Sequence, residues 1–216
     1  MLHIHFFSFN PFNENTYVLY DSESKECIIV DPGCSDRNEE QELVKFIDSK
    51  GLRPLRLLNT HCHIDHIFGN RFVSEKYKLP LEASSLELPN LRAADVYADQ
   101  FGVQPPKSPE PGNFIEEGNT IKIGNSTLET FFTPGHSAGH LSFYNKEQKF
   151  IISGDVLFRE SIGRTDLPGG DYKTLIKSIK EKLFVLDDEV EVYSGHGPKT
   201  TIGYERKHNP FMLAEV

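Results

Sequence analysis

The stretch "NTHCHIDHIFGN", residues 59–70, concentrates four ionisable side chains within six positions: His61, His63, Asp65 and His66. It follows the apolar run "LRLL", which predicts a strand. Residues two apart in extended backbone point to the same side, so the first two imidazoles would project together. Asp65 and His66 follow where the chain turns into a helix. One interpretation is a metal site, and the other is a turn in which Asp65 caps the helix. The cap leaves three clustered histidines unexplained, so the metal site is favoured.

Three later segments repeat this pattern of an apolar strand that ends in an ionisable residue beside glycine. "FFTPGH" ends at His136, "FIISGD" at Asp155 and "VYSGH" at His196. Such strand ends commonly carry binding sites in α/β proteins, although each residue taken singly is more often part of a turn. Together with the first cluster they predict one converging shell of seven ligands: His61, His63, Asp65, His66, His136, Asp155 and His196.

Five imidazoles and two carboxylates suit Zn, Fe or Mn without any thiolate. Seven ligands exceed one tetrahedral shell, which favours two divalent ions about 3.5 to 4 Å apart with a bridging carboxylate. Zn is the first expectation. Cys62 would point away from the two histidines that flank it and is interpreted as a small buried residue. His140 leaves two alternatives open, a hydrogen bond that supports the ligands or packing within a strand.

Composition limits the class of protein. A chain of 216 residues with 38% hydrophobic and 25% charged residues predicts one globular domain over residues 1–216. The 23 basic and 32 acidic residues give a net charge of −9 without a basic run, so no nucleic-acid partner is expected. No apolar run approaches the roughly 20 residues that cross a bilayer, and no signal peptide is recognised. Three cysteines without a disulfide or metal spacing favour free thiols in the cytoplasm.

Hydrophobic periodicity predicts strands that alternate with helices, and hence an α/β protein with two sheets covered by helices. Residues 79–113, which contain six prolines, are predicted to form an elaborated loop beside the site, with a short helix near 91–101. The other predicted helices cover 36–50, about 65–78, 172–183 and a last turn or two within 204–213. The predicted strands cover 3–9, 16–20, 27–31, 55–60, 114–116, 120–123, 127–132, 141–145, 149–153 and 190–195.

The motifs "THCHIDH", "TPGHSAGH", "SGDVLF" and "SGHG", in that order, resemble the metal motifs of metallo-β-lactamase-fold hydrolases over nearly the whole chain. The resemblance implies a four-layer αββα sandwich with a metal pair at one edge between the sheets. It implies that His61, His63 and His136 hold the first ion. In the same way, Asp65, His66 and His196 would hold the second ion, and Asp155 would bridge the two.

Within that family the chain looks most like the glyoxalase II-like hydroxyacylglutathione hydrolases. β-Lactamases of this fold lack the bridging aspartate that Asp155 would provide. "GRTDLPGGD" at 163–171 and "GHGPKTTIGYERKHNPF" at 195–211 are similar to the short bacterial members. Arg164 matches a basic residue near the glutathione part of the substrate, but Asp166 replaces an aromatic residue of that group. The helical domain that binds glutathione in longer members has no counterpart in the twenty residues after His196.

The resemblance implies hydrolysis of a glutathione-type or related small thioester, with a metal-bridging hydroxide as the nucleophile. Asp65 would orient the hydroxide and take its proton. Persulfide dioxygenases of the same fold share "HCHIDH" and "GRTD" and hold one iron, here on His61, His136 and Asp155, so that activity is the first alternative. A small phosphodiester hydrolase would also retain all seven residues. A structural metal protein is disfavoured because two ions with seven ligands leave room for water.

Overall fold

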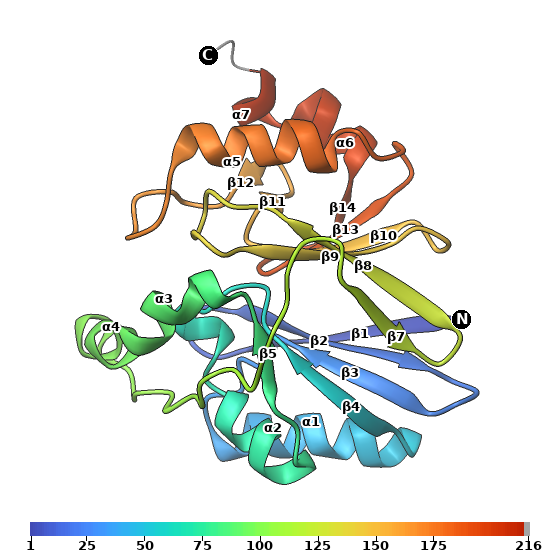
Figure 1. Ribbon diagram of the computed structural model, residues 1–216, viewed down its shortest axis with the longest axis vertical. Coiled ribbons are helices and arrows are strands. Elements are labelled where there is room, and N and C mark those ends of the chain that lie inside the picture. The colour runs from blue at the N-terminus through green and yellow to red at the C-terminus, as the bar shows by residue number, and fades with distance from the viewer. Residues whose placement is uncertain (214–216) are drawn as a thin grey trace. The chain divides into compact units, whose positions relative to one another are not determined.

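The computed structural model describes residues 1–213 (Figure 1). The chain divides into two compact units. The first consists of residues 1–115 and 122–127, and the second of residues 116–121 and the described residues from 128 onward. Each unit combines strands with helices that cover them. The assignment of residues 1–216 to one domain stays a prediction.

The first unit contains a six-stranded mixed sheet in the order β1–β2–β3–β4–β5–β6. The first three strands pair antiparallel, and the remaining pairs are parallel. Parallel pairing brings the ends of β3 and β4 to the same edge of the sheet. The strands are β1 (Leu2–Phe9), β2 (Glu14–Asp21), β3 (Glu26–Val30), β4 (Arg53–Leu58), β5 (Leu81–Ala83) and β6 (Asn113–Phe114).

Two helices, α1 (Arg37–Lys50) and α2 (Asn70–Tyr77), cover one face of this sheet (Figure 1). The start of α1 is capped by Asp36, whose side chain accepts hydrogen bonds from the backbone N–H groups of Asn38 and Glu39. Leu43 of α1 and Val73 of α2 are fully buried in the same apolar cluster as strand residues of β1 to β5. The predicted helix over residues 36–50 is confirmed.

The predicted helix over residues 65–78 is wrong in its first part. A short 3₁₀ turn, η1 (Ile64–His66), comes first, and α2 begins only at Asn70 with Gly69 at its N-cap position. The backbone N–H of Gly69 donates to the carbonyl of Pro32 at 2.7 Å, and a Cβ at this glycine would lie 2.2 Å from the Cys34 sulfur. This close approach interrupts the helix, so Asp65 does not cap α2.

Residues 79–113 are more regular than the predicted loop. Besides β5 and β6, they form η2 (Ser85–Glu87), α3 (Leu88–Arg92) and α4 (Ala94–Phe101). The single helix predicted near 91–101 is therefore two helices that join at Ala93. Leu91 and Ala94 pack in one apolar cluster with Cys62. The segment thus contacts the histidine-rich stretch directly.

The second sheet has the order β14–β13–β10–β9–β8–β7. β10 pairs parallel with β13 and antiparallel with β9, and a separate hairpin of β11 and β12, which the sequence pattern did not predict, follows β10. The strands are β7 (Thr120–Ile123), β8 (Ser126–Phe132), β9 (Leu141–Asn145), β10 (Phe150–Gly154), β11 (Leu157–Phe158), β12 (Ser161–Ile162), β13 (Glu191–Ser194) and β14 (Thr200–Thr201).

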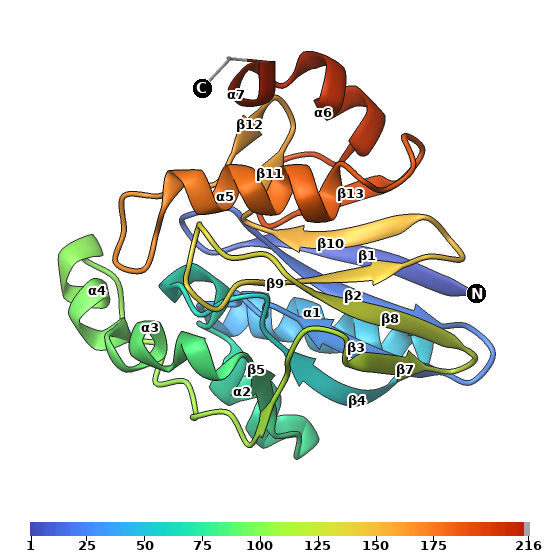
Figure 2. The ribbon, with the colours of Figure 1, turned by 45° about the horizontal axis from the view of Figure 1, so that its top comes forward.

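Helix α5 (Tyr172–Ser178) continues into a π-helical turn, Ile179–Leu183, and lies along this sheet, with α6 (Ile202–His208) and α7 (Pro210–Leu213) beyond it (Figure 2). Leu175 and Ile179 pack against Ile151 and Val192 of the strands. The predicted α/β architecture of two sheets covered by helices is confirmed. Between residues 1 and 213, no helix has both the length and the apolarity that crossing a membrane requires.

The cap of α1 gives a test of how this helix is held. Replacing Asp36 with alanine leaves two N–H groups at the helix start without their acceptor, so the free energy of unfolding should fall by about 1 kcal/mol. Urea denaturation followed by circular dichroism measures this loss. Asp36→Asn retains a side-chain oxygen and should stay within a few tenths of a kcal/mol of the original protein. Equal stability of the alanine variant would contradict the assigned cap.

Candidate metal centre

The first four predicted ligands lie together in the first unit, just beyond the end of β4. The ring centre of His61 lies 4.7 Å from that of His63 and 4.1 Å from that of His66. An oxygen of Asp65 lies 3.7 Å from Nε2 of His66. His61 and His66 are fully buried, whereas 14% of the Asp65 side chain is exposed. The cluster therefore combines fixed imidazoles with a carboxylate that water can reach.

A carboxylate absent from the prediction, Asp31, lies behind these histidines at the end of β3. Its Oδ1 accepts the backbone N–H of Thr60 at 2.7 Å, and its Oδ2 accepts the Thr60 hydroxyl at 2.6 Å. The same Oδ2 lies 3.1 Å from Nδ1 of His66. Asp31 is buried and its backbone has a positive φ of 50°. It thereby joins the ends of two parallel strands and one of the predicted ligands.

These contacts decide which nitrogen of each ring carries the proton. The Thr60 hydroxyl donates its single proton to Asp31, so it accepts from Nδ1 of His61 across 3.0 Å. A carboxylate only accepts when ionised, so Nδ1 of His66 donates to Asp31. Both rings then present the lone pair of Nε2, which is the arrangement of a metal-binding histidine with a supporting acceptor.

The three later predicted ligands lie together in the second unit. Oδ2 of Asp155 lies 3.5 Å from Nε2 of His136 and 3.6 Å from Nε2 of His196. Asp155 directly follows β10, and His196 follows β13, which is the parallel neighbour of β10. Nδ1 of His136 donates to the carbonyl oxygen of Arg164 at 2.8 Å, so this ring also presents Nε2.

His140 supports this second group rather than merely filling space between strands. Its Nε2 accepts the backbone N–H of Asp155 at 3.1 Å, and its Nδ1 lies 3.0 Å from the Thr133 hydroxyl. His140 is therefore neutral, with its proton on Nδ1. Gly163 completes the packing, because a Cβ there would lie 1.9 Å from the carbonyl oxygen of Asp155. The backbone of Asp155 is thus fixed from two sides.

The side chain of Arg164, predicted to contact substrate, is already paired. Its guanidinium donates to both carboxylate oxygens of Asp166, each at 2.7 Å. These hydrogen bonds lower the pKa of Asp166 to about 2. The folded pKa lies below the ordinary value near 3.9, so the pairing is complete above about pH 4 and is lost as the pH falls through about 2. At neutral pH Arg164 is a partly neutralised cation.

Cys62 has the buried role that the sequence predicts. The thiol is 1% exposed, and burial, followed by the nearby Glu87 carboxylate, raises its pKa well above the ordinary range. Among the residues from 1 to 213, Cys62 belongs to none of the groups that could hold a metal ion, and it packs in an apolar cluster instead.

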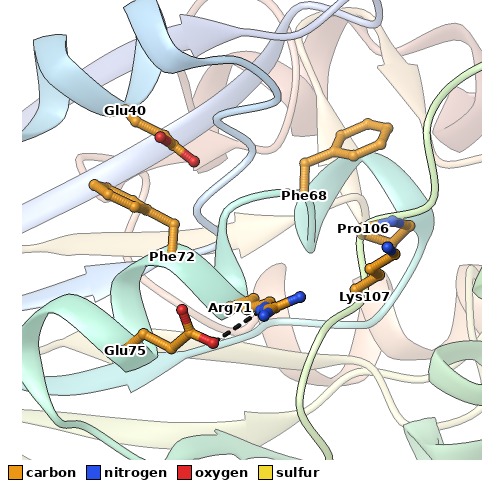
Figure 3. Close-up of a pocket in the computed structure, with 7 residues that line it drawn as sticks. All are labelled: Glu40, Phe68, Arg71, Phe72, Glu75, Pro106 and Lys107. Atoms are coloured by element: carbon orange, nitrogen blue, oxygen red, sulfur yellow. Dashed lines mark hydrogen bonds and ion pairs between the residues drawn. The ribbon is translucent and has the colours of Figure 1, made fainter.

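A surface pocket on the outer side of α2 carries none of the predicted ligands (Figure 3). Nε of Arg71 pairs with Oε1 of Glu75 at 2.8 Å, so much of its charge is satisfied within the helix. The lining combines two acidic, two basic and three apolar residues: Glu40, Phe68, Arg71, Phe72, Glu75, Pro106 and Lys107. It offers no donor set for a divalent metal.

The ligand chemistry therefore fits a divalent metal. Rings with a supported Nδ1 present Nε2, and carboxylates lie within 4 Å of those nitrogens in both groups. Asp31, His61 and His66 also offer atoms within 4.8 Å of one another. However, Oδ2 of Asp31 already accepts two hydrogen bonds, so we assign it to orienting the histidines.

Comparison with known proteins places these groups in context. A model of the metallo-beta-lactamase superfamily matches residues 9–196. A probable metallo-hydrolase of Bacillus subtilis, YqgX, is 41% identical over 204 residues, which cover 94% of this chain and 93% of the relative. The hydroxyacylglutathione hydrolase GloC of Haemophilus influenzae is 36% identical and covers 93% of both chains.

Solved structures extend the similarity to three dimensions. BLEG-1, described as a B3 metallo-beta-lactamase, is 37% identical with a TM-score of 0.87 and covers 98% of this chain and 100% of its own. TTHA1623, solved in a di-iron-bound form, is 39% identical with a TM-score of 0.85 and covers 96% and 99%. The predicted fold class is confirmed.

Two hydrogen bonds link His61 through the Thr60 hydroxyl to Asp31, so metal binding should depend on that hydroxyl. Thr60→Val removes the acceptor of the Nδ1 proton while it preserves the side-chain shape. Its affinity for Zn²⁺ should fall about 10- to 100-fold, as is typical for the loss of such supporting contacts. Competition with a chromophoric chelator measures this affinity. Thr60→Ser, which keeps the hydroxyl, should bind Zn²⁺ as tightly as the original protein does. An equal loss of Zn²⁺ affinity in both variants would refute the supporting role of the hydroxyl.

Proposed function

We propose, from the premise that this chain belongs to the metallo-β-lactamase superfamily of metal-dependent hydrolases, that it cleaves small thioesters of the glutathione type. The observation that carries the proposal is Asp155, whose Oδ2 faces Nε2 of both His136 and His196 at 3.5 and 3.6 Å. A carboxylate so placed suits a bridge between two ions. The 36% identity to GloC supports the choice of substrate class.

In this proposal, His61, His63 and His136 hold one divalent ion, Asp65, His66 and His196 hold another, and Asp155 bridges them. The orientation of three rings supports the assignment. Nδ1 of His66 is held by Asp31, and Nδ1 of His61 is held by Thr60, which in turn contacts Asp31. Nδ1 of His136 is held by the carbonyl of Arg164. Zn²⁺ suits the imidazole and carboxylate donors. The di-iron form of TTHA1623 makes iron the other candidate.

Two divalent ions, when bound, would lower the pKa of a water molecule to near 7 and polarise the substrate carbonyl. The side chains of the protein would orient the attacking water and accept its proton. Asp65 lies 3.7 Å from Nε2 of His66 and is partly exposed, so its carboxylate can align the attacking water and accept its proton. The leaving thiolate has a pKa near 8.5 and needs little help from an acid. Cys62 supplies no nucleophile, since its thiol is buried and burial raises its pKa.

A second candidate function is β-lactam hydrolysis, which the likeness to BLEG-1 favours. Asp155 weighs against it, because a bridging aspartate is the feature by which the chain resembles the glyoxalase II-like hydrolases rather than the β-lactamases. The thioesterase proposal therefore stands first. Oxygen-dependent oxidation of a persulfide on a single iron is the outcome that would replace it.

The activity and the metal content can be tested together. Purified protein should contain two divalent ions per chain and hydrolyse S-lactoylglutathione. It should consume no oxygen with glutathione persulfide, and it should cleave a chromogenic cephalosporin at least a hundredfold more slowly than the thioester. Elemental analysis, thiol release, an oxygen electrode and absorbance supply the four measurements. One iron per chain together with oxygen uptake would overturn the proposal.

Variants of the ligands serve as the internal controls of that experiment. Asp155→Ala and His61→Ala should lose bound metal and turnover together, because each would remove a direct ligand. Asp187→Ala, at a carboxylate that is 71% exposed, should change neither. Full turnover by metal-free Asp155→Ala would exclude the dinuclear mechanism.

The pairing of Arg164 with Asp166 predicts how an anionic thiol is recognised. If Arg164 binds a carboxylate of the substrate, Asp166→Ala frees the guanidinium of Arg164 for that contact. This variant should lower the KM for S-lactoylglutathione roughly threefold to tenfold. Arg164→Ala should raise that KM. A thioester of an uncharged thiol provides the matched comparison and should respond to neither change. Identical KM values for the glutathione thioester in all three proteins would remove Arg164 from the substrate site.

A further inference from the structure

The residue between the first two predicted ligands is held by its backbone. The peptide N–H of Cys62 donates to Oε2 of Glu87 at 2.8 Å. Cys62 lies beyond Leu58, the last residue of β4 that pairs with β3 and β5, so this donor needs an acceptor from outside the sheet. Glu87 is 1% exposed and belongs to η2, within the segment predicted as an accessory loop. A buried carboxylate thus supplies the missing acceptor.

The carboxylate itself is fixed by the same segment. The side-chain amide of Asn90, three residues further along at the start of α3, donates to the same Oε2 at 2.9 Å. Asn90 is 7% exposed and Cys62 is 1% exposed, so these two donors to Oε2 are shielded from water. Hydrogen bonds to an ionised acceptor are shorter and stronger than neutral ones, which offsets the cost of burying the charge.

The side chain of Cys62 packs against residues of the same segment, 79–113. It packs in an apolar cluster with Ala83 of β5, Leu91 of α3 and Ala94 at the start of α4. The cluster surrounds the thiol, whereas the orientation of the peptide between His61 and Cys62 is set by the hydrogen bond to Glu87. Rotation of the peptide between His61 and Cys62 would change the torsions next to His61 and redirect its ring.

We propose that Glu87 is a positioning residue for metal binding, which fixes the His61–Cys62–His63 turn through the Cys62 peptide. This inference rests on the proposed metal centre. An apolar side chain would fill the space at position 87 without the cost of a buried charge, so packing alone does not account for a carboxylate there. In this proposal, residues 79–113 fix the orientation of the turn that carries His61 and His63, and do not only lie beside it.

The test compares the acceptor with its removal. Glu87→Leu replaces the carboxyl group with an apolar side chain that fills much of the same space but leaves the Cys62 N–H without its acceptor, and Glu87→Gln retains an amide oxygen. The dissociation constant for Zn²⁺, measured by chelator competition below the melting temperature of every variant, should rise about 10- to 100-fold for leucine. It should stay within about threefold for glutamine.

Two controls separate positioning from stability. Glu110→Gln removes an exposed carboxylate of the same segment, 60% exposed and paired with Arg92, and should leave Zn²⁺ binding unchanged. Leu91→Ala weakens the packing around Cys62 but keeps the acceptor. It should lower the melting temperature while it changes the dissociation constant less than threefold. If Glu87→Leu does not fold, Glu87→Asp, which withdraws the carboxylate by one methylene group, takes its place with the same expected loss.

The outcomes distinguish this inference from the function on which it rests. Unchanged Zn²⁺ affinity in Glu87→Leu, or in its aspartate replacement, overturns the positioning role while the metal centre stands. An equal loss in Leu91→Ala also overturns it, because general destabilisation would then explain the effect. Failure of the unmodified protein to bind Zn²⁺ would instead remove the proposed centre itself.

Discussion

The metal centre proposed for this chain depends on one requirement, that neutral histidines present Nε2 and therefore keep their proton on Nδ1. His66 meets it through Asp31 directly, and His61 meets it through Thr60, whose hydroxyl is polarised by the same carboxylate. His136 meets it through a backbone carbonyl. Imidazoles without such partners would exchange tautomers and rotate, and metal binding would then carry the cost of ordering them.

Support of this kind accounts for three of the buried polar side chains of the fold, Asp31, Glu87 and His140. The clusters beneath the helices are mostly isoleucine, leucine and valine, whereas other buried polar residues, such as Glu14 and Thr16 of β2, lie within strands. These three side chains act beyond strand ends, where the sheet no longer supplies partners for backbone groups. Asp31 and Glu87 accept N–H groups there in the first unit, and His140 does so in the second. Each of these three side chains thus fixes the backbone of a predicted ligand or of its neighbour.

Much of this was predictable from the sequence because the signals were local. Long strands and helix α1 follow clear periodicity, and the three ligand-bearing strand ends share one pattern of apolar residues, glycine and an ionisable residue. Asp31 follows the strand "CIIV" and precedes "PG", so the same pattern could have identified it. The two-residue strands β11, β12 and β14 are too short to show any period.

Other features depend on contacts between distant residues. The late start of α2 follows from the approach of Gly69 to Pro32 and Cys34, which no local propensity reports. Glu87 occupies a position where an exposed helical glutamate would be unremarkable, and only the fold brings it to Cys62. The sequence showed that Asp166 stands in place of an aromatic residue, but not that its carboxylate forms a bidentate contact with Arg164.

The backbone at Asp31 restricts the choice of residue at this position in two independent ways. Its φ of 50° lies in the left-handed region, which asparagine, aspartate and glycine adopt most readily. Its side chain must also accept hydrogen bonds at both oxygens. Glycine satisfies the backbone but offers no acceptor, glutamate offers the carboxylate but tolerates the backbone poorly, and asparagine turns one acceptor into a donor. Of the common amino acids, aspartate alone meets both demands, so the position has almost no latitude for substitution even though it would bind no metal itself.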